Sequence, residues 1–589
     1  MKTIIKSTAI LMAMMLLAGC ETFLDTESYT DRNTGNFPSS ETDAIQLVTG
    51  IYSTMNAVVQ DPGTSYWMTA MLASDECYGG GGMDDSDVQA ADHLLVTEEN
   101  VHGELWEQYN SGIARANMAI ANLDKVEDAD MRNQLLGEAY FMRSYFLFEL
   151  AQLFGEIPLI SQVPTNVEEA SEYPAQAPIE NIYGTIAAGL KKAIEIMPSN
   201  KWNACITGIR HATKWDAEAM LARVYLFYTG FYSDKNNTTI TTLPLVNLEN
   251  GELLSEEVSK TYVVEKLKDC IDNSGHDLVK DFRLMWPYMN SATKKDYAYA
   301  AAIEGTWITD DVNPEAMFSI CNSNIGDGFG NKFNQYLGVR KRGDYYSNAF
   351  PFSRGYGWAP VNPYVWTKWA EEEPGDIRRE ASIWNLADEG NSDYTWGNDN
   401  QMEETGFWQK KYQTWGAIVD GKFFYEFSSV PEYGGFGSDL GRGQSPQNIQ
   451  ILSFADVLLM HSELTETVDG INRVRQRVGL SPIGSYSFEA LEKERRHELA
   501  FEAIRWTDMR RYGKAYCIAA LKTQLGGIIR NGTGGAEQPM KDQGPGYQAR
   551  YEATWGFRPF PQSEVSLSNG ILKQNAGWTS ADSKYSSWK

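Results

Sequence analysis

The stretch from residue 75 to 85 combines acidic and aromatic side chains with a run of four glycines, 79–82. The residues that could bind a ligand here are Asp75, Glu76, Tyr78 and Asp84. Consecutive glycines disfavour regular secondary structure, so we expect a mobile surface loop on which carboxylates and a phenol meet a polyhydroxylated ligand. A plain solvated loop is the alternative.

A second group of such side chains lies between about residues 286 and 447, where Gly, Asn, Tyr and Trp are frequent and long helical periods are few. The candidates there are Tyr345, Tyr356, Trp358 and Arg378, with Trp366 among several further aromatics. Aromatic faces suit the apolar faces of sugar rings, and Arg can hydrogen-bond their hydroxyls. For any single aromatic, burial in the core is the favoured interpretation. Because Gly357 and Pro360 flank Trp358, its ring is the best candidate for an exposed aromatic, with Tyr356 next.

Motifs of other chemistries are missing from the sequence. None of the six histidines forms an HExxH pair, and neither a G-x-S-x-G elbow nor a phosphate-binding G-x-x-x-x-G-K-[ST] loop occurs. We therefore expect no catalytic residues, no metal ligands and no cofactor. Binding of Ca²⁺ by Asp84, Asp85 and Asp87 stays open as an alternative, although the spacing of these residues does not fit a calcium-binding loop. A glycosidase needs only two carboxylates, and 78 acidic residues cannot exclude one.

Charge and composition narrow the classes of partner. The chain has 589 residues, 42% hydrophobic and 22% charged, which is typical of a globular protein with a large core. Its formal net charge of −27 opposes binding to nucleic acid or to an anionic membrane surface and leaves neutral or cationic ligands. Five widely spaced cysteines beyond Cys20 indicate neither a disulfide framework nor a zinc site.

The N-terminus has the layout of an export signal. Lys2 and Lys6 precede an apolar run, and Leu-Ala-Gly-Cys follows at 17–20. This ending resembles a bacterial lipobox, which implies cleavage before Cys20 and acylation of that cysteine. We expect a signal peptide at 1–19, a lipid-anchored tether at 20–40, and an anchored rather than membrane-spanning protein.

Helical periodicity dominates the rest of the N-terminal half. Helices are predicted over 41–59, 105–126, 131–154, 179–197, 213–228 and 263–273, and another over 448–463. Pairs of such helices with Ala and bulky aromatics at their contacts resemble degenerate tetratricopeptide repeats. We predict a mostly α, single domain over 41–589, with a helical scaffold at about 41–285 and 448–515, an irregular ligand-binding region at 286–447 and a closing segment at 516–589.

Residues 487–513, SFEALEKERRHELAFEAIRWTDMRRYG, carry the signals of one long helix. Ser487 is the expected N-cap and Gly513 the stop, with acidic residues in the first turn and arginines in the last. Glu502 with Arg505, and Asp508 with Arg511, are spaced to pair along the helix. A solvated face held by weak pairs is the alternative to a helix fastened to its neighbours.

This stretch resembles the C-terminal signature of the SusD/RagB family. The matching residues are Glu494, Arg495, Arg496, Glu498, Leu499, Ala500, Phe501, Glu502, Arg505, Trp506, Asp508, Arg510, Arg511 and Gly513. Residues 454–460, 558–564 and 572–578 resemble further family segments, and Cys20 with Phe23-Leu24-Asp25 resembles the start of mature family members.

The resemblance implies a SusD-like fold and a non-catalytic lipoprotein on the cell surface at the outer membrane. Such a protein binds an oligosaccharide or polysaccharide and delivers it to a SusC-like TonB-dependent transporter. Two other functions stay open, a glycoside hydrolase lipoprotein and a peptide-binding or scaffold module. The sequence does not determine the sugar or its linkage.

Overall fold

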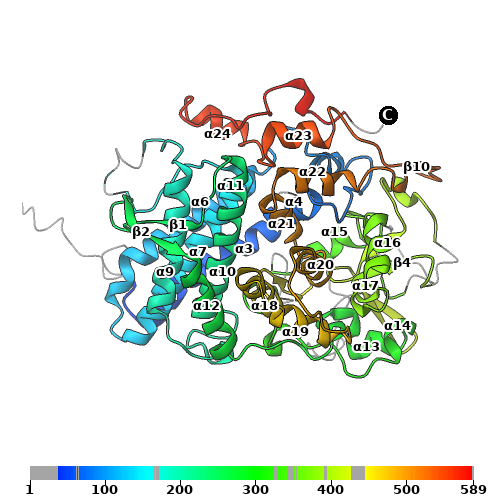
Figure 1. Cartoon of the computed structure of the whole chain (residues 1–589), viewed down its shortest axis with the longest axis horizontal. Helices are drawn as coiled ribbons and strands as arrows, with labels where there is room; N and C mark the ends of the chain where they lie inside the picture. The colour runs from blue at the N-terminus through cyan, green and yellow to red at the C-terminus, as the bar shows by residue number, and fades with distance from the viewer. Residues whose placement is uncertain are drawn as a thin grey trace, which may run out of the picture.

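The computed structural model describes residues 37–60, 63, 65–164, 166, 171–323, 329–340, 350–352, 355–389, 394–425 and 445–586. Cys20, Tyr345, the expected signal peptide and most of the expected tether lie outside these residues. The prediction of a mostly α fold is confirmed, since helices dominate and strands are short (Figure 1). In the part of the chain that is described, no helix combines the length and apolar character needed to cross a membrane.

The scaffold is a stack in which each long helix packs on the next one along the chain (Figure 1). Its members are α3 (Glu41–Val59), α6 (Gly103–Asn122), α7 (Ala129–Phe154), α9 (Ile179–Ile196), α10 (Lys214–Phe227) and α12 (Lys260–Asn273). The helix α18 (Phe454–Thr465) then packs on α12 although almost 200 residues separate them. The stack therefore includes α18, a helix that follows the irregular half in the sequence.

Side-chain caps fix where these helices begin. Ser40 accepts a hydrogen bond from the backbone of Asp43 at the start of α3. Thr213 and Asp216 form a reciprocal capping box at the start of α10. Because such caps satisfy the free N–H groups of a first turn, the predicted starts at 41 and 213 agree with the structure to within one residue.

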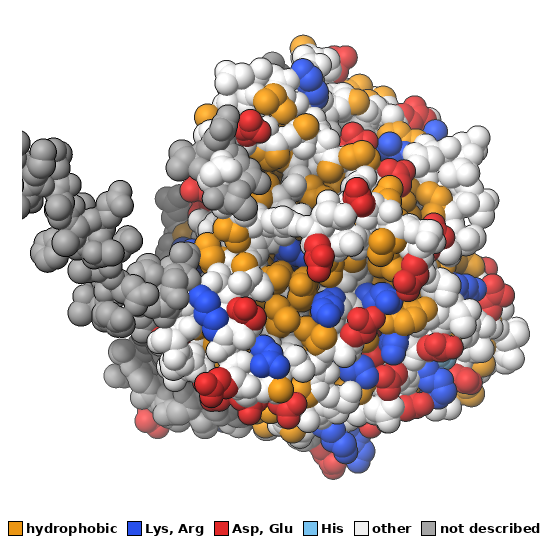
Figure 2. Space-filling model, turned by 90° about the vertical axis from the view of Figure 1, so that its left-hand side faces the viewer, with side chains coloured by type: hydrophobic (Ala, Val, Ile, Leu, Met, Phe, Trp, Pro, Cys, Tyr) orange, Lys and Arg blue, Asp and Glu red, His pale blue; other side chains and the backbone are white. Residues whose placement is uncertain are grey.

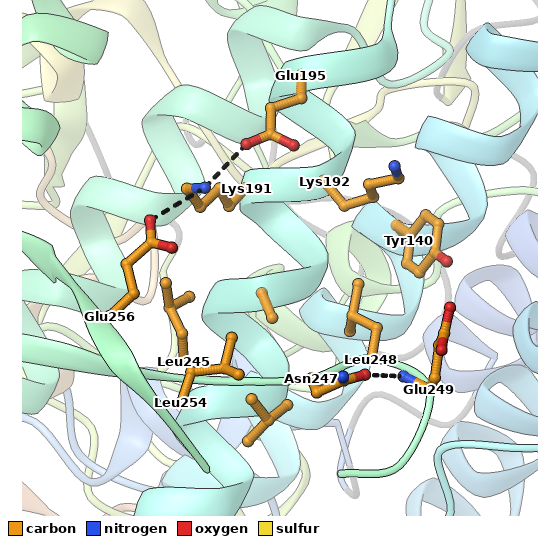
Figure 3. Close-up of a pocket in the computed structure, with 12 residues that line it drawn as sticks. Tyr140, Lys191, Lys192, Glu195, Leu245, Asn247, Leu248, Glu249, Leu254 and Glu256 are labelled. Atoms are coloured by element: carbon orange, nitrogen blue, oxygen red, sulfur yellow. Dashed lines mark hydrogen bonds and ion pairs between the residues drawn. The ribbon is translucent and has the colours of Figure 1, made fainter. Parts of the chain in front are cut away.

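A β-hairpin flanks the stack. Its strands β1 (Thr242–Val246) and β2 (Leu253–Ser259) pair in antiparallel register, and β1 packs on α9. Lys191 of α9 bridges to Glu256 of β2 at 3.4 Å and to Glu195 at 2.9 Å. On this side of the molecule acidic, basic and apolar side chains intermingle (Figure 2), and a shallow cavity lies between the hairpin and α9 (Figure 3).

The irregular half consists of short elements. They include α13 (Ser291–Lys294), α14 (Ala298–Ala301), α15 (Phe333–Leu337), α16 (Pro363–Glu372) and α17 (Ile377–Ser382). Antiparallel two-stranded sheets join β3 (Ser319–Ile320) to β8 (Ile449–Gln450), β4 (Ile383–Asn385) to β5 (Phe407–Gln409), and β6 (Gly416–Val419) to β7 (Lys422–Tyr425). The predicted start of the 448–463 helix is wrong, because β8 occupies that stretch and Ser453 caps α18 five residues later.

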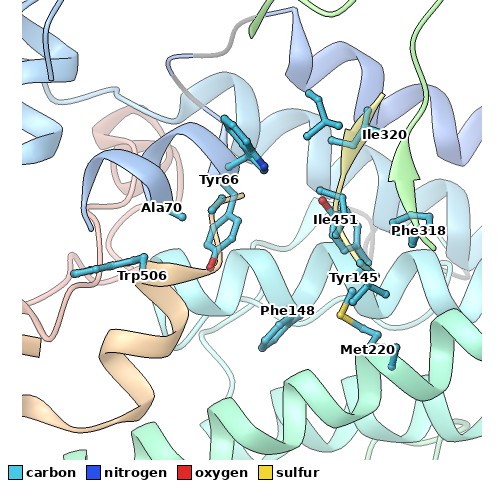
Figure 4. Close-up of a cluster of buried hydrophobic side chains, with 14 of the residues drawn as sticks. Tyr66, Ala70, Tyr145, Phe148, Met220, Phe318, Ile320, Ile451 and Trp506 are labelled. Carbon is cyan, nitrogen blue, oxygen red and sulfur yellow. The ribbon is translucent and has the colours of Figure 1, made fainter. Parts of the chain in front are cut away.

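A single hydrophobic core connects the two halves. Tyr66 of α4 (Tyr66–Leu72) lies beside Trp506, while Tyr145 of α7 packs edge-on against Phe318 with ring centroids 5.6 Å apart (Figure 4). The Tyr66 hydroxyl also donates to Gln152 Oε1 at 2.8 Å. Apolar side chains from the scaffold, the irregular half and the C-terminal helices therefore share one interior.

The closing segment covers one end of the molecule, at the top of Figure 1. Its elements are α22 (Lys514–Lys522), β9 (Ile528–Arg530) paired with β10 (Glu537–Pro539), α23 (Tyr547–Thr554) and α24 (Gln562–Leu567). Arg558 donates to the backbone of Leu95 at 3.0 Å, which ties this segment to the N-terminal part of the chain.

The signature stretch is two helices, so the prediction of one continuous helix over 487–513 is wrong. The helix α20 (Phe488–Glu498) begins at the Ser487 cap as expected, and α21 (Arg505–Arg511) follows after a turn. Within the turn Phe501 and Ala503 have φ of 63° and 61°, values that a right-handed helix does not allow. The break turns the two arginine-rich helices toward different parts of the molecule.

Candidate functional site

The acidic residues predicted to face solvent at the glycine-rich stretch are buried. Asp75 lies 2.7 Å from Arg505 Nε and 2.9 Å from Arg496, and no part of it is exposed. Burial alone would raise the pKa of Asp75, but these two guanidinium groups outweigh burial and lower it. Burial, helped by the charge of Asp75, raises the pKa of Glu76 to about 7.

Tyr78 is also fully buried, with its hydroxyl donating to the Gln524 carbonyl at 2.8 Å. The glycines after it lie against the strand-like segment at 355–361 by backbone hydrogen bonds, such as Gly81 N–H to the Gly357 carbonyl at 2.7 Å. A Cβ on Gly80 would lie 2.4 Å from Pro360 Cδ. The glycines thus allow two backbones to approach closely, and the prediction that Asp75, Glu76 and Tyr78 belong to an exposed loop is wrong.

Two predicted residues of the irregular half are buried as well. Trp358 is 8% exposed and packs edge-on against Tyr336, with ring centroids 4.4 Å apart. Arg378 is 0% exposed and is surrounded by carboxylates. Trp358, the best candidate for an exposed ring, instead fills the core. Arg378, predicted as a ligand-binding residue, instead fastens α17 to α20.

Asp84 and Tyr356 come together at the surface around Arg340. The guanidinium of Arg340 lies 3.8 Å from Asp84 and 3.1 Å from Asp85, and it donates to the Tyr356 carbonyl at 2.9 Å. The Asp84 side chain is 83% exposed, and the Tyr356 ring is half-buried. Since Arg340 already supplies positive charge to two of the three aspartates considered for Ca²⁺, the need for a cation there is reduced.

A cavity of about 520 Å³ opens elsewhere in the irregular half. It is lined by Asp296, Tyr297, Ala298, Tyr299, Phe350, Trp366, Glu380, Asn385, Asp388 and Glu389. This volume is in the range of small-ligand sites, and the lining combines aromatic faces with carboxylate and amide groups. The residues come from the N-terminal part of α14, from α16 and α17, and from the end of β4.

Buried polar contacts position the aromatic walls of this cavity. The Tyr297 hydroxyl donates to Glu389, which also accepts from Lys410 Nζ at 2.6 Å. Lys410 lies 4.0 Å from the centroid of the Tyr299 ring. Burial lowers the pKa of Lys410, and Glu389 opposes that shift.

Trp366 also lines the cavity. The guanidinium of Arg379 lies 4.2 Å from the centroid of its ring, and Phe407 packs 5.6 Å away on a tilted plane. Trp366 and Tyr299 are both half-buried, which leaves part of each ring available to a ligand. Asn385 donates to Asp388 at 2.6 Å, so that side chain is already oriented at the rim.

Aromatic rings beside fixed hydrogen-bonding groups can stack on a sugar and accept hydrogen bonds from its hydroxyls. Sequence reasoning named Trp366 only as one of several aromatics and missed Tyr299, Glu380 and Asp388. The Tyr297-Ala298-Tyr299 run was a usable signal. The cavity depends on contacts such as that between Tyr297 and Glu389, 92 residues apart, which local pattern does not indicate.

The cavity beneath the β-hairpin suits such a ligand less well. Its volume is about 440 Å³, and Tyr140 is the only aromatic residue in its lining (Figure 3). Lys191, a cation at its rim, is already paired with Glu195 and Glu256. We therefore take the aromatic cavity as the candidate site.

The architecture is a helical-repeat scaffold that supports a loop-rich half with an aromatic cavity. Residues 22–226 match a SusD-like family model described as starch-binding and associating with the outer membrane. Residues 368–578 match the model of the SusD family itself. The two matches together span more than half of the chain, and the protein belongs to the SusD/RagB family.

Full-length relatives agree with this assignment. The SusD-like protein P2 of Formosa agariphila is 23% identical over 577 residues, covering 92% of this chain and 94% of that protein. Surface glycan-binding protein A from Bacteroides fluxus has the same fold, with a TM-score of 0.65 and 20% identity over 92% of this chain and all of that one. Surface glycan-binding protein A from Bacteroides thetaiotaomicron, solved in complex with laminarihexaose, has a TM-score of 0.60 and 16% identity over 91% of this chain and 99% of that one.

Proposed function

We propose that this protein captures an oligosaccharide at the cell surface, without cleaving it, and delivers it to a SusC-like TonB-dependent transporter. The observation that supports this most is a cavity with two partly exposed aromatic rings on a fold of the SusD/RagB family. Glycan binding by proteins of the same fold supports the ligand class. Acylation of Cys20 would hold the protein at the outer membrane.

The charge of the cavity favours neutral sugars. Four carboxylates line it, Asp296, Glu380, Asp388 and Glu389, and no Lys or Arg is among the described residues of its lining. Lys410 lies behind the aromatic wall and pairs with Glu389. A sulfated or uronic-acid glycan would meet like charge here, whereas a neutral glycan offers hydroxyl donors to the carboxylates.

Isothermal titration calorimetry with a panel of neutral and anionic oligosaccharides tests the proposal. We expect binding of at least one neutral glycan, with Trp366→Ala weakening it at least tenfold, about 1.4 kcal/mol. Trp202→Ala is the matched control, because Trp202 lies on the scaffold and stacks on His276, outside the cavity. No binding to any glycan would contradict the proposal.

A third variant locates the site. If Tyr356→Ala abolishes binding while Trp366→Ala does not, the glycan binds at the Arg340 surface rather than in the cavity. Release of reducing ends from a bound glycan would show a hydrolase instead. Peptide binding that is unchanged in both Tyr356→Ala and Trp366→Ala would favour a peptide-binding module.

Delivery requires a complex with the transporter. We expect a TonB-dependent transporter to co-purify with the acylated protein from detergent-solubilised outer membranes, and Cys20→Ala to release the protein from that fraction. Membrane association that survives Cys20→Ala in the absence of any transporter would contradict the proposed anchor.

A further inference from the structure

A buried group of metal-ligand side chains lies away from the cavity. Asp92 is the last residue of α5 (Ser86–Asp92), His93 follows it, and Glu403 comes from the loop before β5. One ligand atom from each lies within 4.8 Å of the others. Their exposed fractions are 0%, 1% and 0%, so water does not solvate the two carboxylates.

Two carboxylates in such a place require a compensating positive charge or proton. Asp92 forms no ion pair with Lys or Arg in the described part of the chain. A proton or a cation can therefore balance this carboxylate, and the surrounding oxygen atoms help to decide between them.

Two buried oxygen atoms near the group have no hydrogen-bond partner among the residues that the structure describes. One is Asp92 Oδ2, and the other is Oε1 of Gln524, a side chain that is 0% exposed and lies next to Asp92. One oxygen of each carboxylate is held by a hydrogen bond, since Tyr547 donates to Asp92 Oδ1 at 3.2 Å and Gly80 N–H donates to Glu403 Oε2 at 2.7 Å. Contacts of this kind orient the ligands of a metal ion.

Stacked aromatic rings hold the imidazole of His93 in place. The rings of Tyr547 and Tyr585 stack on His93 with centroids 5.6 and 6.0 Å away. His93 Nε2 lies 3.8 Å from Glu403 Oε1. Two ligands about 2.1 Å from a tetrahedral ion are about 3.4 Å apart, so only a small closure would bring both to an ion.

We propose that Asp92, His93 and Glu403 bind one Zn²⁺ ion, with Gln524 Oε1 or a water as the fourth ligand. Two carboxylate oxygens and one imidazole nitrogen are a ligand set that Zn²⁺ accepts. The imidazole disfavours Ca²⁺ and Mg²⁺, which prefer oxygen ligands alone. The ion would be structural, because the group is enclosed and the cavity lies elsewhere.

The position of the ion gives it a mechanical role. It would join the end of α5 to the loop that carries Glu403 and, through Gln524 and Tyr547, to the closing segment. Glu403 also accepts a hydrogen bond from Gly80, within the glycine run that precedes Asp84. The ion would therefore stabilise the glycine run next to the surface formed by Asp84, Tyr356 and Arg340.

Metal-free full-length protein titrated with ZnCl₂ tests the site. We expect one Zn²⁺ per chain by elemental analysis and calorimetry, and a rise in Tm of about 2 °C or more that EDTA reverses. Asp92→Asn should abolish both effects. Asp87→Asn, an exposed position on the same helix, should leave them unchanged.

A second measurement does not depend on whether the variant folds. Co²⁺ added to the wild-type protein should give the visible absorption of a low-coordinate site, and Zn²⁺ should displace it. Absence of bound Zn²⁺ and of a Co²⁺ spectrum would overturn the proposal. Stabilisation by Ca²⁺ but not by Zn²⁺ would also overturn it.

Discussion

Arg378 is buried and charged because three carboxylates surround its guanidinium. Asp376, Glu494 and Glu498 lie 2.7, 2.7 and 2.8 Å from it. Burial alone would lower the pKa of Arg378, but these charges raise it. The signature arginines and acids of α20 are therefore clamps between helices, and the solvated-face alternative for this stretch is wrong.

Removing this guanidinium should destabilise the fold strongly. Arg378→Ala leaves three buried carboxylates without their cation, and we expect the free energy of unfolding to fall by roughly 3–5 kcal/mol. Guanidinium chloride denaturation measures it. Lys268→Ala is the control, since its pair with Asp272 is mostly exposed and should contribute no more than about 0.5 kcal/mol. Equal effects of both substitutions would refute the clamp.

Glu149 gives the protein a pH-dependent stability. Its carboxylate is buried in α7 beside Tyr109 and Tyr145, and burial raises its pKa from 4.5 to about 7. The folded state therefore binds a proton more tightly than the unfolded state, so this contribution is fully present below about pH 4.5 and is lost as the pH rises through 7.

Glu149→Gln should remove that dependence, because the amide is neutral at every pH. We expect the stability of the variant relative to wild type to increase between pH 5 and 7 and to level off above pH 8. Urea denaturation at each pH measures the difference. A difference that does not change with pH would show that Glu149 has an ordinary pKa in the folded protein.

The break between α20 and α21 directs two sets of charges to different partners. Arg495 of α20 contacts Asp456 of α18 at 2.7 Å, whereas Arg505 of α21 contacts Asp75. The predicted pair of Asp508 with Arg511 is confirmed at 2.8 Å. The predicted pair of Glu502 with Arg505 is wrong, because Glu502 lies before α21 and binds Lys411 at 2.7 Å instead.

A glycine substitution distinguishes this turn from a helix. Ala503 has φ of 61°, where an L-residue is strained by about 1–2 kcal/mol, and glycine relieves the strain. The loss of one methyl and the greater freedom of the unfolded chain offset that gain, so Ala503→Gly should be nearly neutral.

The same change at Ala187, buried in α9, should cost about 2 kcal/mol because helix propensity and the methyl are both lost. Chemical denaturation of the two variants supplies the comparison. Equal costs would indicate that the chain is helical at 503.

Local signals predicted the scaffold but not the site. The helix at 41–59 was predicted to the residue, and that at 131–154 to within two, because apolar period and caps are properties of neighbouring residues. Asp75 was mistaken for a loop acid because its partner, Arg505, is 430 residues away. Trp358 was the best candidate for an exposed ring, but Tyr336, which packs against it, belongs to α15 and lies 22 residues earlier in the chain.

The shared core and the charge clamps predict that the described chain unfolds as one unit. Arg223 of α10 contacts Asp456 of α18 at 2.6 Å, and Lys411 of the irregular half contacts Glu502. A fragment ending near residue 285 would expose Tyr145, which packs on Phe318, and would leave Arg223 without its carboxylate. We therefore expect residues 41–285 alone to lack fixed tertiary structure.

Scanning calorimetry and near-ultraviolet circular dichroism test this prediction together. The full chain should show one calorimetric transition, coincident with loss of the near-ultraviolet signal, and the fragment should show neither. Two separate transitions, or a cooperative melt of the fragment, would mean that the scaffold is an independent domain. In that case the ligand-bearing half could move against its support, and the cavity would no longer be fixed by the core beneath it.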